Sequence, residues 1–181
     1  MAYKGFAYCV FAPIEGEADG LPVYGNGAAL GRAIKYELDP EYEDTAEYND
    51  MNDLDPAQEF ARAKLSLETA EISAPAALML GEFFADDGLV SVDTAPASPC
   101  GIGIVRRYSK GSETGWAVTW FYKVVIRSVK DRGETRDKSI TYSTSEIDAL
   151  VIPASAGRWR KNIYFDSKDE AVTYINRVAG I

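Results

Sequence analysis

The sequence predicts a mainly β (α+β) protein in which two antiparallel sheets form a β sandwich or half-open barrel. Apolar and polar residues alternate at period two in several segments, the spacing that puts successive side chains on opposite faces of a strand. Glycine, proline and Asp-Gly turn signals separate these segments, as is usual between antiparallel strands. A short helix near 73–81 and a C-terminal helix near 168–179 are expected beside the sheets.

The first half of the chain begins with an alternating segment at 3–12, which predicts a strand that Pro13 ends. The stretch 15–31 is so rich in glycine that we expect a long loop there. Alternation returns at 33–38 and stops at an Asp-Pro step, where we expect a turn. A second long loop is therefore predicted at about 39–57.

The next strand is predicted at 58–69, where small and apolar residues alternate with charged ones, so that one face is buried and the other solvated. A serine, a proline, alanines, leucines and a final glycine predict the short helix at 73–81. Residues 86–88 and 95–99 are expected to be loops, and 100–106 a strand.

The hydrophobic centre of the chain is the twelve-residue run 116–127, whose aromatic and β-branched content predicts a long central strand. We expect 136–143 to return beside it as a hairpin partner, and a further strand at 158–165. Ser167 and Glu170 form a capping box at the start of the closing helix.

The chain has 181 residues, 46% of them hydrophobic and 26% charged, which is typical of one globular domain, so a single domain over 1–181 is expected. The start lacks a signal-peptide pattern and no run of about 18 apolar residues occurs, so we expect folding in a cytoplasm and no membrane partner. The cysteines, Cys9 and Cys100, lie far apart and are expected to be small buried hydrophobic residues.

Charge is unevenly distributed along the chain. The net charge is −9; residues 1–100 hold 19 acidic and 5 basic side chains, and 101–181 hold 9 and 14. An acidic chain of this kind is not expected to grip nucleic-acid phosphates. The imbalance has two interpretations: two ordinary solvated faces, or opposite poles that meet when copies pack head to tail.

No catalytic or metal-binding pattern emerges, so the chain is predicted not to be an enzyme and to need no cofactor. The absence of histidine excludes Ser-His-Asp and Cys-His arrangements and histidine-based zinc sites. Carboxylate pairs such as Glu43 with Glu47 lie in an acidic run at 37–55 without lysine or arginine, which indicates solvated surface charge. That run lacks the glycine and glutamate of an EF-hand loop, and 101–103 lacks the third glycine of a nucleotide-binding turn.

Several features follow one another in a fixed order along nearly the whole chain. They are an N-terminal strand, an acidic segment containing tyrosine (46–50), an alternating strand, a helix ending in Leu80-Gly81, a Pro-x-Gly-x-Gly strand entry (99–103), an aromatic strand centred on 121–124, a Ser/Thr strand and a closing helix with an acidic cap. This order of features resembles the major tail tube protein family of long-tailed, non-contractile bacteriophages.

The resemblance implies hexameric rings of this chain stacked into a hollow tube through which DNA passes without specific binding. It also implies a place in the virion, assembly in the host cytoplasm, and contacts with tape-measure, tail terminator and distal tail proteins. Glu37, Glu59 and Glu68 are then candidates for lining the channel, where carboxylates repel DNA phosphates. The candidate inter-subunit loop residues are Glu43, Asp44, Glu47, Tyr48, Asp50 and Asp53. Deletion of 41–53 is expected to leave a folded monomer that cannot polymerise.

Two alternatives remain open on the sequence. One is a monomeric β-sandwich module that binds a peptide or carbohydrate on a platform of Tyr42, Tyr48, Trp159 and Tyr164. The other is a different ring-forming virion part, either a single-layer ring such as a tail terminator or a tube of a contractile tail. Self-association distinguishes the first alternative from a tube protein, and the stacking of rings distinguishes a single-layer ring.

Overall fold

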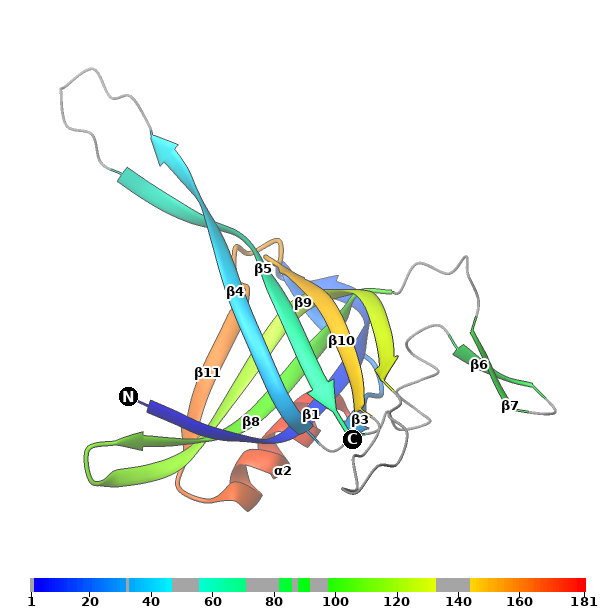
Figure 1. Cartoon of the computed structure of the whole chain (residues 1–181). Helices are drawn as coiled ribbons and strands as arrows, with labels where there is room; N and C mark the ends of the chain where they lie inside the picture. The colour runs from blue at the N-terminus through cyan, green and yellow to red at the C-terminus, as the bar shows by residue number, and fades with distance from the viewer. Residues whose placement is uncertain are drawn as a thin grey trace.

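The computed structural model describes residues 2–31, 33–46, 56–70, 82–85, 88–91, 98–132 and 144–181. Strands dominate these ranges (Figure 1). The elements are β1 (Ala2–Ala18), β2 (Leu21–Tyr24), β3 (Ala28–Gly31), β4 (Ala33–Ala46), β5 (Pro56–Thr69), β6 (Glu82–Ala85), β7 (Gly88–Ser91), β8 (Cys100–Lys110), β9 (Glu113–Arg132), β10 (Thr144–Ile152), β11 (Arg160–Phe165) and α2 (Lys168–Ala179).

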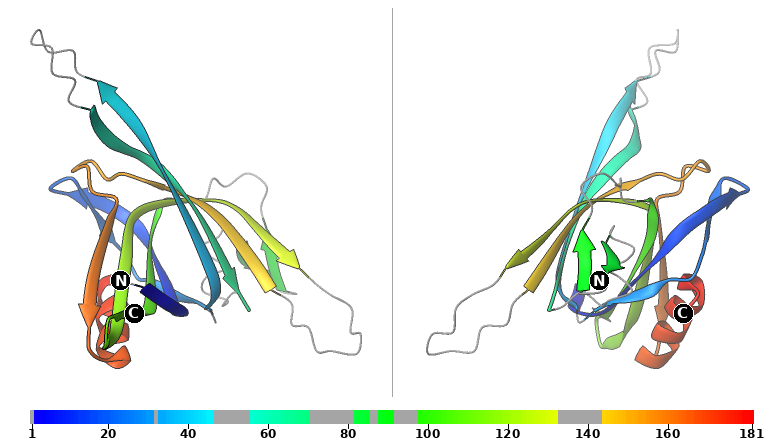
Figure 2. Two further views of the ribbon diagram at one scale, coloured as in Figure 1. Left: turned by 60° about the vertical axis from the view of Figure 1, so that its left-hand side comes forward. Right: turned by 90° about the vertical axis from the view of Figure 1, so that its right-hand side faces the viewer.

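Nine of the strands form one antiparallel sheet in the order β2-β1-β8-β9-β10-β5-β4, with β3 also paired to β1 and β11 also paired to β9. The long strand β9 joins two layers. Its first part lies between β8 and β11, with β8 pairing as far as Val124, and its second part pairs with β10 from Lys123 onward. The sheet therefore curls into a half-open barrel (Figure 2).

The space between the two layers is filled by one apolar cluster to which both contribute. Phe121 and Val124 of β9 are fully buried at its centre, together with Leu65 and Leu67 of β5. The other members are Cys9, Phe11, Ala28, Leu30, Ala63, Cys100, Ile102, Ile104, Ile147, Ala149 and Val151. Both cysteines are free thiols inside this cluster, which confirms that they are buried apolar residues.

Helix α2 covers the outer surface of β1, β8 and β9 and buries Ala171, Ile175 and Ala179 there. The Ser167 half of the predicted capping box is present at its N-terminus, where the Glu170 backbone N–H donates to the Ser167 hydroxyl at 3.2 Å. Gly103 on β8 allows the close approach, since a Cβ there would lie 2.5 Å from Cδ1 of Ile175.

The predicted fold class is confirmed, with the two layers being halves of one continuous sheet. The strands predicted at 3–12, 58–69, 100–106, 116–127 and 158–165 are present, most of them longer than expected. The helix predicted near 168–179 runs from Lys168 to Ala179. The helix predicted near 73–81 and the strand predicted at 136–143 lie outside the described residues.

The predicted long loop at 15–31 is wrong. Strand β1 continues to Ala18 and forms a tight hairpin with β2, and β3 follows. Asp19 and Gly20 make the turn with φ of 51° and 72°, the positive values that a two-residue hairpin with matching strand twist requires. The many small residues of this stretch therefore build short strands and tight turns.

The predicted loop at 39–57 is also wrong at both ends, because β4 runs on to Ala46 and β5 begins at Pro56. Pro40 sits inside β4, opposite Ala63. Proline has no N–H to donate and is tolerated in a strand at the edge of a sheet, which is the position of β4. Only 47–55 of the predicted loop lies outside the described residues.

Candidate assembly surface

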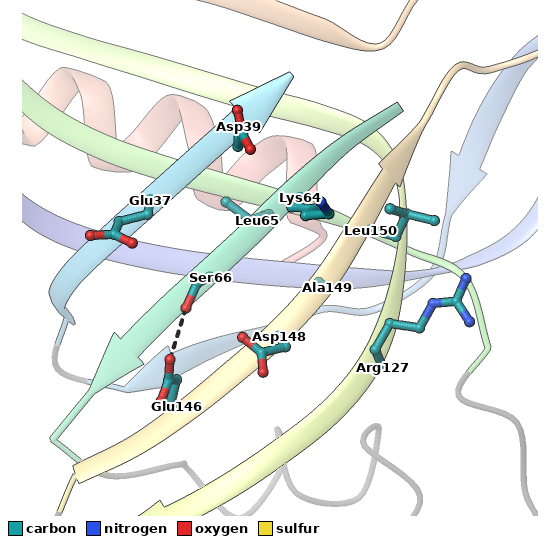
Figure 3. Close-up of a pocket in the computed structure, with 10 residues that line it drawn as sticks. All are labelled: Glu37, Asp39, Lys64, Leu65, Ser66, Arg127, Glu146, Asp148, Ala149 and Leu150. Atoms are coloured by element: carbon teal, nitrogen blue, oxygen red, sulfur yellow. Dashed lines mark hydrogen bonds between the residues drawn. The ribbon is translucent and has the colours of Figure 1, made fainter. Parts of the chain in front are cut away.

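The solvent-facing side of the layer β4-β5-β10-β9 carries most of the charged side chains of these four strands, and we call it the polar face. Side chains from all four strands line a shallow groove of about 540 Å³ on it (Figure 3). The polar face consists of Lys35, Glu37, Asp39, Glu41 and Glu43 of β4, Glu59, Arg62, Lys64, Ser66 and Glu68 of β5, Glu146 and Asp148 of β10, and Arg127 and Ser128 of β9.

The three predicted channel-lining residues, Glu37, Glu59 and Glu68, all lie on the polar face. Glu37 pairs with Ser66 and Glu68 with Lys35 in the β4–β5 register. Glu59 is brought to the same side by a bulge at Ala61, which shifts the register so that Tyr42 faces Phe60 and Glu43 faces Glu59. Without that extra residue, Glu59 would point with the buried side chains of β5.

Local ion pairs offset only part of the negative charge of the polar face. Glu41 accepts from Arg62 Nε at 2.6 Å and from Lys64 Nζ at 3.0 Å, and these two bonds lower the pKa of its carboxyl group. Glu37 pairs with Lys35, and this contact raises the pKa of the lysine. Acidic side chains still outnumber basic ones on this face, so it presents a negative potential to solvent.

Two strand edges of this layer have no partner among the described strands. β4 pairs with β5 alone, and β9 has no partner beyond Val124 on the side that β8 occupies earlier. The β4 edge is acidic, with Glu37, Asp39 and Glu43, whereas the sequence of the β9 edge is mainly basic. Each edge also exposes an apolar side chain, Ile34 on β4 and Val129 on β9. Open edges of this kind pair with other chains.

The ends of β4 and β5 extend beyond the body of the barrel as a two-stranded projection, the hairpin arm, defined here as Tyr42–Ala46 and Pro56–Phe60 (Figures 1 and 2). Glu43 and Asp44, predicted as loop residues, are therefore strand residues of the arm. The other predicted inter-subunit residues, Glu47, Tyr48, Asp50 and Asp53, lie outside the described residues.

The aromatic platform considered in the sequence analysis is not formed by the described residues. Trp159 is half-buried and stacks on Phe60 with ring centroids 4.1 Å apart, so its face is already occupied. Tyr164 lies near the other end of β11, where its hydroxyl is 3.3 Å from that of Tyr3. Tyr48 lies outside the described residues.

Arg127, Glu146 and Asp148 line the groove but were not singled out in the sequence. The signal for two of them was present: Glu146, Asp148 and Leu150 alternate with Ile147, Ala149 and Val151 across 144–152, the pattern of a half-buried strand. Arg127 lines the groove because of a bulge between β9 and β10, and no pattern in the sequence predicts that bulge.

In the described ranges no three histidine, cysteine or acidic side chains gather in a way that could hold a metal ion. No helix of these ranges is long and apolar enough to span a membrane. The polar face is thus a surface of charges and strand edges, suited to contact with other chains.

No family model and no curated protein matches the chain. The chain is similar to several solved structures, including the following two. "Structure of a type six secretion system protein" is 12% identical, covers 87% of this chain and 91% of that chain, and gives a TM-score of 0.36. "Crystal structure of Hcp protein" is 8% identical, covers 88% and 100%, and gives 0.32. At these TM-scores neither structure defines a function for this chain.

Proposed function

We propose that this chain is a structural protein that assembles with copies of itself into stacked rings, forming the hollow tail tube of a long-tailed, non-contractile phage. The observation that carries the proposal is the pair of unpartnered, oppositely charged edges on one four-stranded layer. The sequence resemblance supplies the kind of assembly, and the polar face and its edges supply the surface.

The order of strands supports a ring. The four strands of the layer alternate in direction, so β4 of one copy meets β9 of an identically oriented neighbour in antiparallel fashion. Such a contact joins two different surfaces and is heterologous, so repeating it closes a ring if the rotation between copies allows closure. Edge pairing also removes the exposed edges that a lone subunit leaves open. Six copies per ring is the number that the resemblance implies.

In such a ring the four-stranded layers join into one barrel, and the polar face lines its channel. Glu37 and Glu68 then point toward the passing DNA, whereas Glu59 lies on the hairpin arm. A lining with excess carboxylates repels phosphates, so that DNA moves without sticking. The channel function in this proposal is mechanical.

The hairpin arm is the element that we assign to contacts between successive rings. It extends beyond the body of the subunit and carries Glu43 and Asp44, which belong to the acidic run 37–55. Tape-measure, tail terminator and distal tail proteins are the further partners in this proposal, and the virion is the location.

Negative-stain electron microscopy of the purified protein at high concentration, with size-exclusion chromatography of the same sample, tests the proposal. Sixfold rings or hollow tubes are expected. Rings that never stack favour a single-layer ring protein, and a monomer at every concentration contradicts the proposal.

A variant without the arm sharpens the test. Because Tyr42 faces Phe60, residues 43–59 can be replaced by an Asn-Gly turn without disturbing the barrel. This variant should fold and form single rings that do not stack. Tubes of normal appearance from this variant would show that the arm plays no part in stacking.

A further inference from the structure

Arg106 on β8 is a buried arginine that lacks an acidic partner. Its side chain is 8% exposed, and no carboxylate of the described residues forms an ion pair with it. Nη2 donates to Oγ1 of Thr119 at 3.1 Å and Nη1 donates to the Tyr36 hydroxyl, but Nε has no acceptor. A buried charge normally has an opposite charge beside it, because desolvation is otherwise uncompensated. An anion is the kind of group that compensates such a charge.

Two tyrosine rings, those of Tyr3 and Tyr36, lie near this guanidinium, and the nearer one is exposed. The ring of Tyr3 lies over it, with the guanidinium carbon 3.5 Å from the ring centroid, although Tyr3 itself is 40% exposed. Thr119, which accepts from Arg106, is itself held by a hydrogen bond that it donates to Oδ1 of Asn162 at 2.6 Å. Tyr3 is therefore the exposed part of the surroundings, and its displacement breaks the contact of its hydroxyl with that of Tyr164 and its pairing with Tyr108.

Gly5 provides a hinge for that movement. Its φ of 74° lies in the left-handed region, and the β1–β8 register shifts between Lys4 and Phe6. No atom lies within 4 Å of the position of a Cβ on Gly5, so the backbone has room to rotate there. A swing of residues 2–4 about Gly5 breaks their pairing with residues 107–109 of β8, whereas Phe6, whose ring packs against Tyr36, stays in place.

We propose that Arg106 and its surroundings are a carboxylate-binding site, closed by Tyr3 in the single chain and occupied by an acidic side chain of a second copy in the assembly. With Tyr3 displaced, the guanidinium can turn and present Nε and one terminal nitrogen to both oxygens of a carboxylate, the strongest geometry for this pair. Chain assembly itself opens the site.

The donors are the carboxylates of Glu43 and Glu59 on the hairpin arm, and this assignment rests on the proposed function. The two glutamates face each other across the arm, where like charges directly opposite destabilise a strand pair. Neither forms an ion pair within the described ranges. The arm extends beyond the body of its own subunit (Figure 2). Contact with Arg106 of the neighbouring copy reduces the repulsion between the two glutamates and gives the buried guanidinium an acidic partner.

A titration with sodium acetate tests the site without any assembly. Monomeric protein carrying ¹⁵N-labelled arginine is titrated against a sodium chloride control of equal ionic strength, and the Nε–H resonance missing from Arg106→Met identifies Arg106. A saturable shift with acetate alone is expected, and Tyr3→Ala should need several-fold less acetate. Absence of an acetate-specific shift in both the native chain and Tyr3→Ala overturns the site.

Sedimentation velocity then tests the donors. Replacing both Glu43 and Glu59 by glutamine should raise the concentration needed for assembly at least about tenfold, and should add nothing in an Arg106→Met background. The pair Glu15→Gln and Glu17→Gln, exposed on β1, is the matched control and should change little. An equal effect with and without Arg106 overturns the donor assignment, as does a chain that never assembles, while the acetate result decides the site separately.

Discussion

Phe60 on the hairpin arm and Trp159 just before β11 stack with ring centroids 4.1 Å apart and planes 5° from parallel. Trp159 also lies over Phe121 of the core at 6.5 Å and carries the Arg160 guanidinium 4.3 Å from its ring centroid. This stack ties the base of the arm to the opposite layer of the barrel. Trp159→Ala should therefore lower the free energy of unfolding by about 3 kcal/mol, measured by urea unfolding of the monomer.

Tyr42→Ala is the matched control for the stack. Tyr42 meets the edge of Phe60 at 6.0 Å but is 49% exposed, so its removal should cost about 1 kcal/mol or less. Equal losses for the two variants would mean that the stack does not couple the layers.

Gly103 sets the distance between α2 and the sheet. An added Cβ would lie 2.5 Å from Cδ1 of Ile175 and 2.7 Å from Trp120, both inside the packed contact. We expect Gly103→Ala to destabilise the protein by about 1–3 kcal/mol in thermal or urea unfolding. Gly16→Ala, where no atom lies within 4 Å and φ is not positive, should be close to neutral. A neutral Gly103→Ala would show that α2 can shift outward freely.

The strands with long, regular alternation could be predicted from the sequence because local burial alone fixes their pattern. The turn predicted at Pro40 is wrong for a different reason. Proline ends a strand only where its missing N–H would be needed, and whether β4 is an edge depends on the order of strands across the whole sheet. That order is set by non-local pairing, which no local window contains.

The same distinction between local patterns and non-local pairing applies to the candidate site. Glu37 and Glu68 could be placed on the solvated face by alternation, but the position of Glu59 depends on the bulge at Ala61. Arg106 carried no signal, since an arginine near the end of an apolar strand is usually solvated. Its burial results from Tyr3 and Tyr36, which distant segments bring over it.

Alkaline pH should weaken the fold through its buried thiols. Burial raises the pKa of Cys100 from 9.0 to about 12, and raises that of Cys9 as well. A raised pKa in the folded state means that the thiols of the unfolded chain lose their protons first. The contribution of the buried thiols to the free energy of unfolding is therefore fully present below about pH 9 and decreases as the pH rises toward 12. Urea unfolding across that range should show the decline.

Variants of Tyr24 and of the two cysteines show which groups cause the loss of stability at alkaline pH. Burial also raises the pKa of Tyr24 from 10.0 to about 12, so Tyr24→Phe should flatten the decline only above about pH 10. The double variant Cys9→Ala with Cys100→Ala should flatten it from about pH 9. A decline unchanged in the double cysteine variant would assign the effect to other groups.

The opposite charges of the two open edges predict a charge-reversal pattern in assembly. Glu37→Lys with Asp39→Lys places basic groups on the β4 edge against the basic β9 edge of the neighbour, and should raise the concentration needed for ring formation at least about tenfold. Arg127→Glu alone should weaken assembly in the same direction, and the three changes together should restore much of it, because attraction returns with reversed sign.

Arg158→Glu, an exposed basic residue away from both edges, is the control. Light scattering against concentration measures all four. If the combined variant shows the losses of assembly of the separate variants added together, the two edges do not meet. The ring would then have to close through another surface.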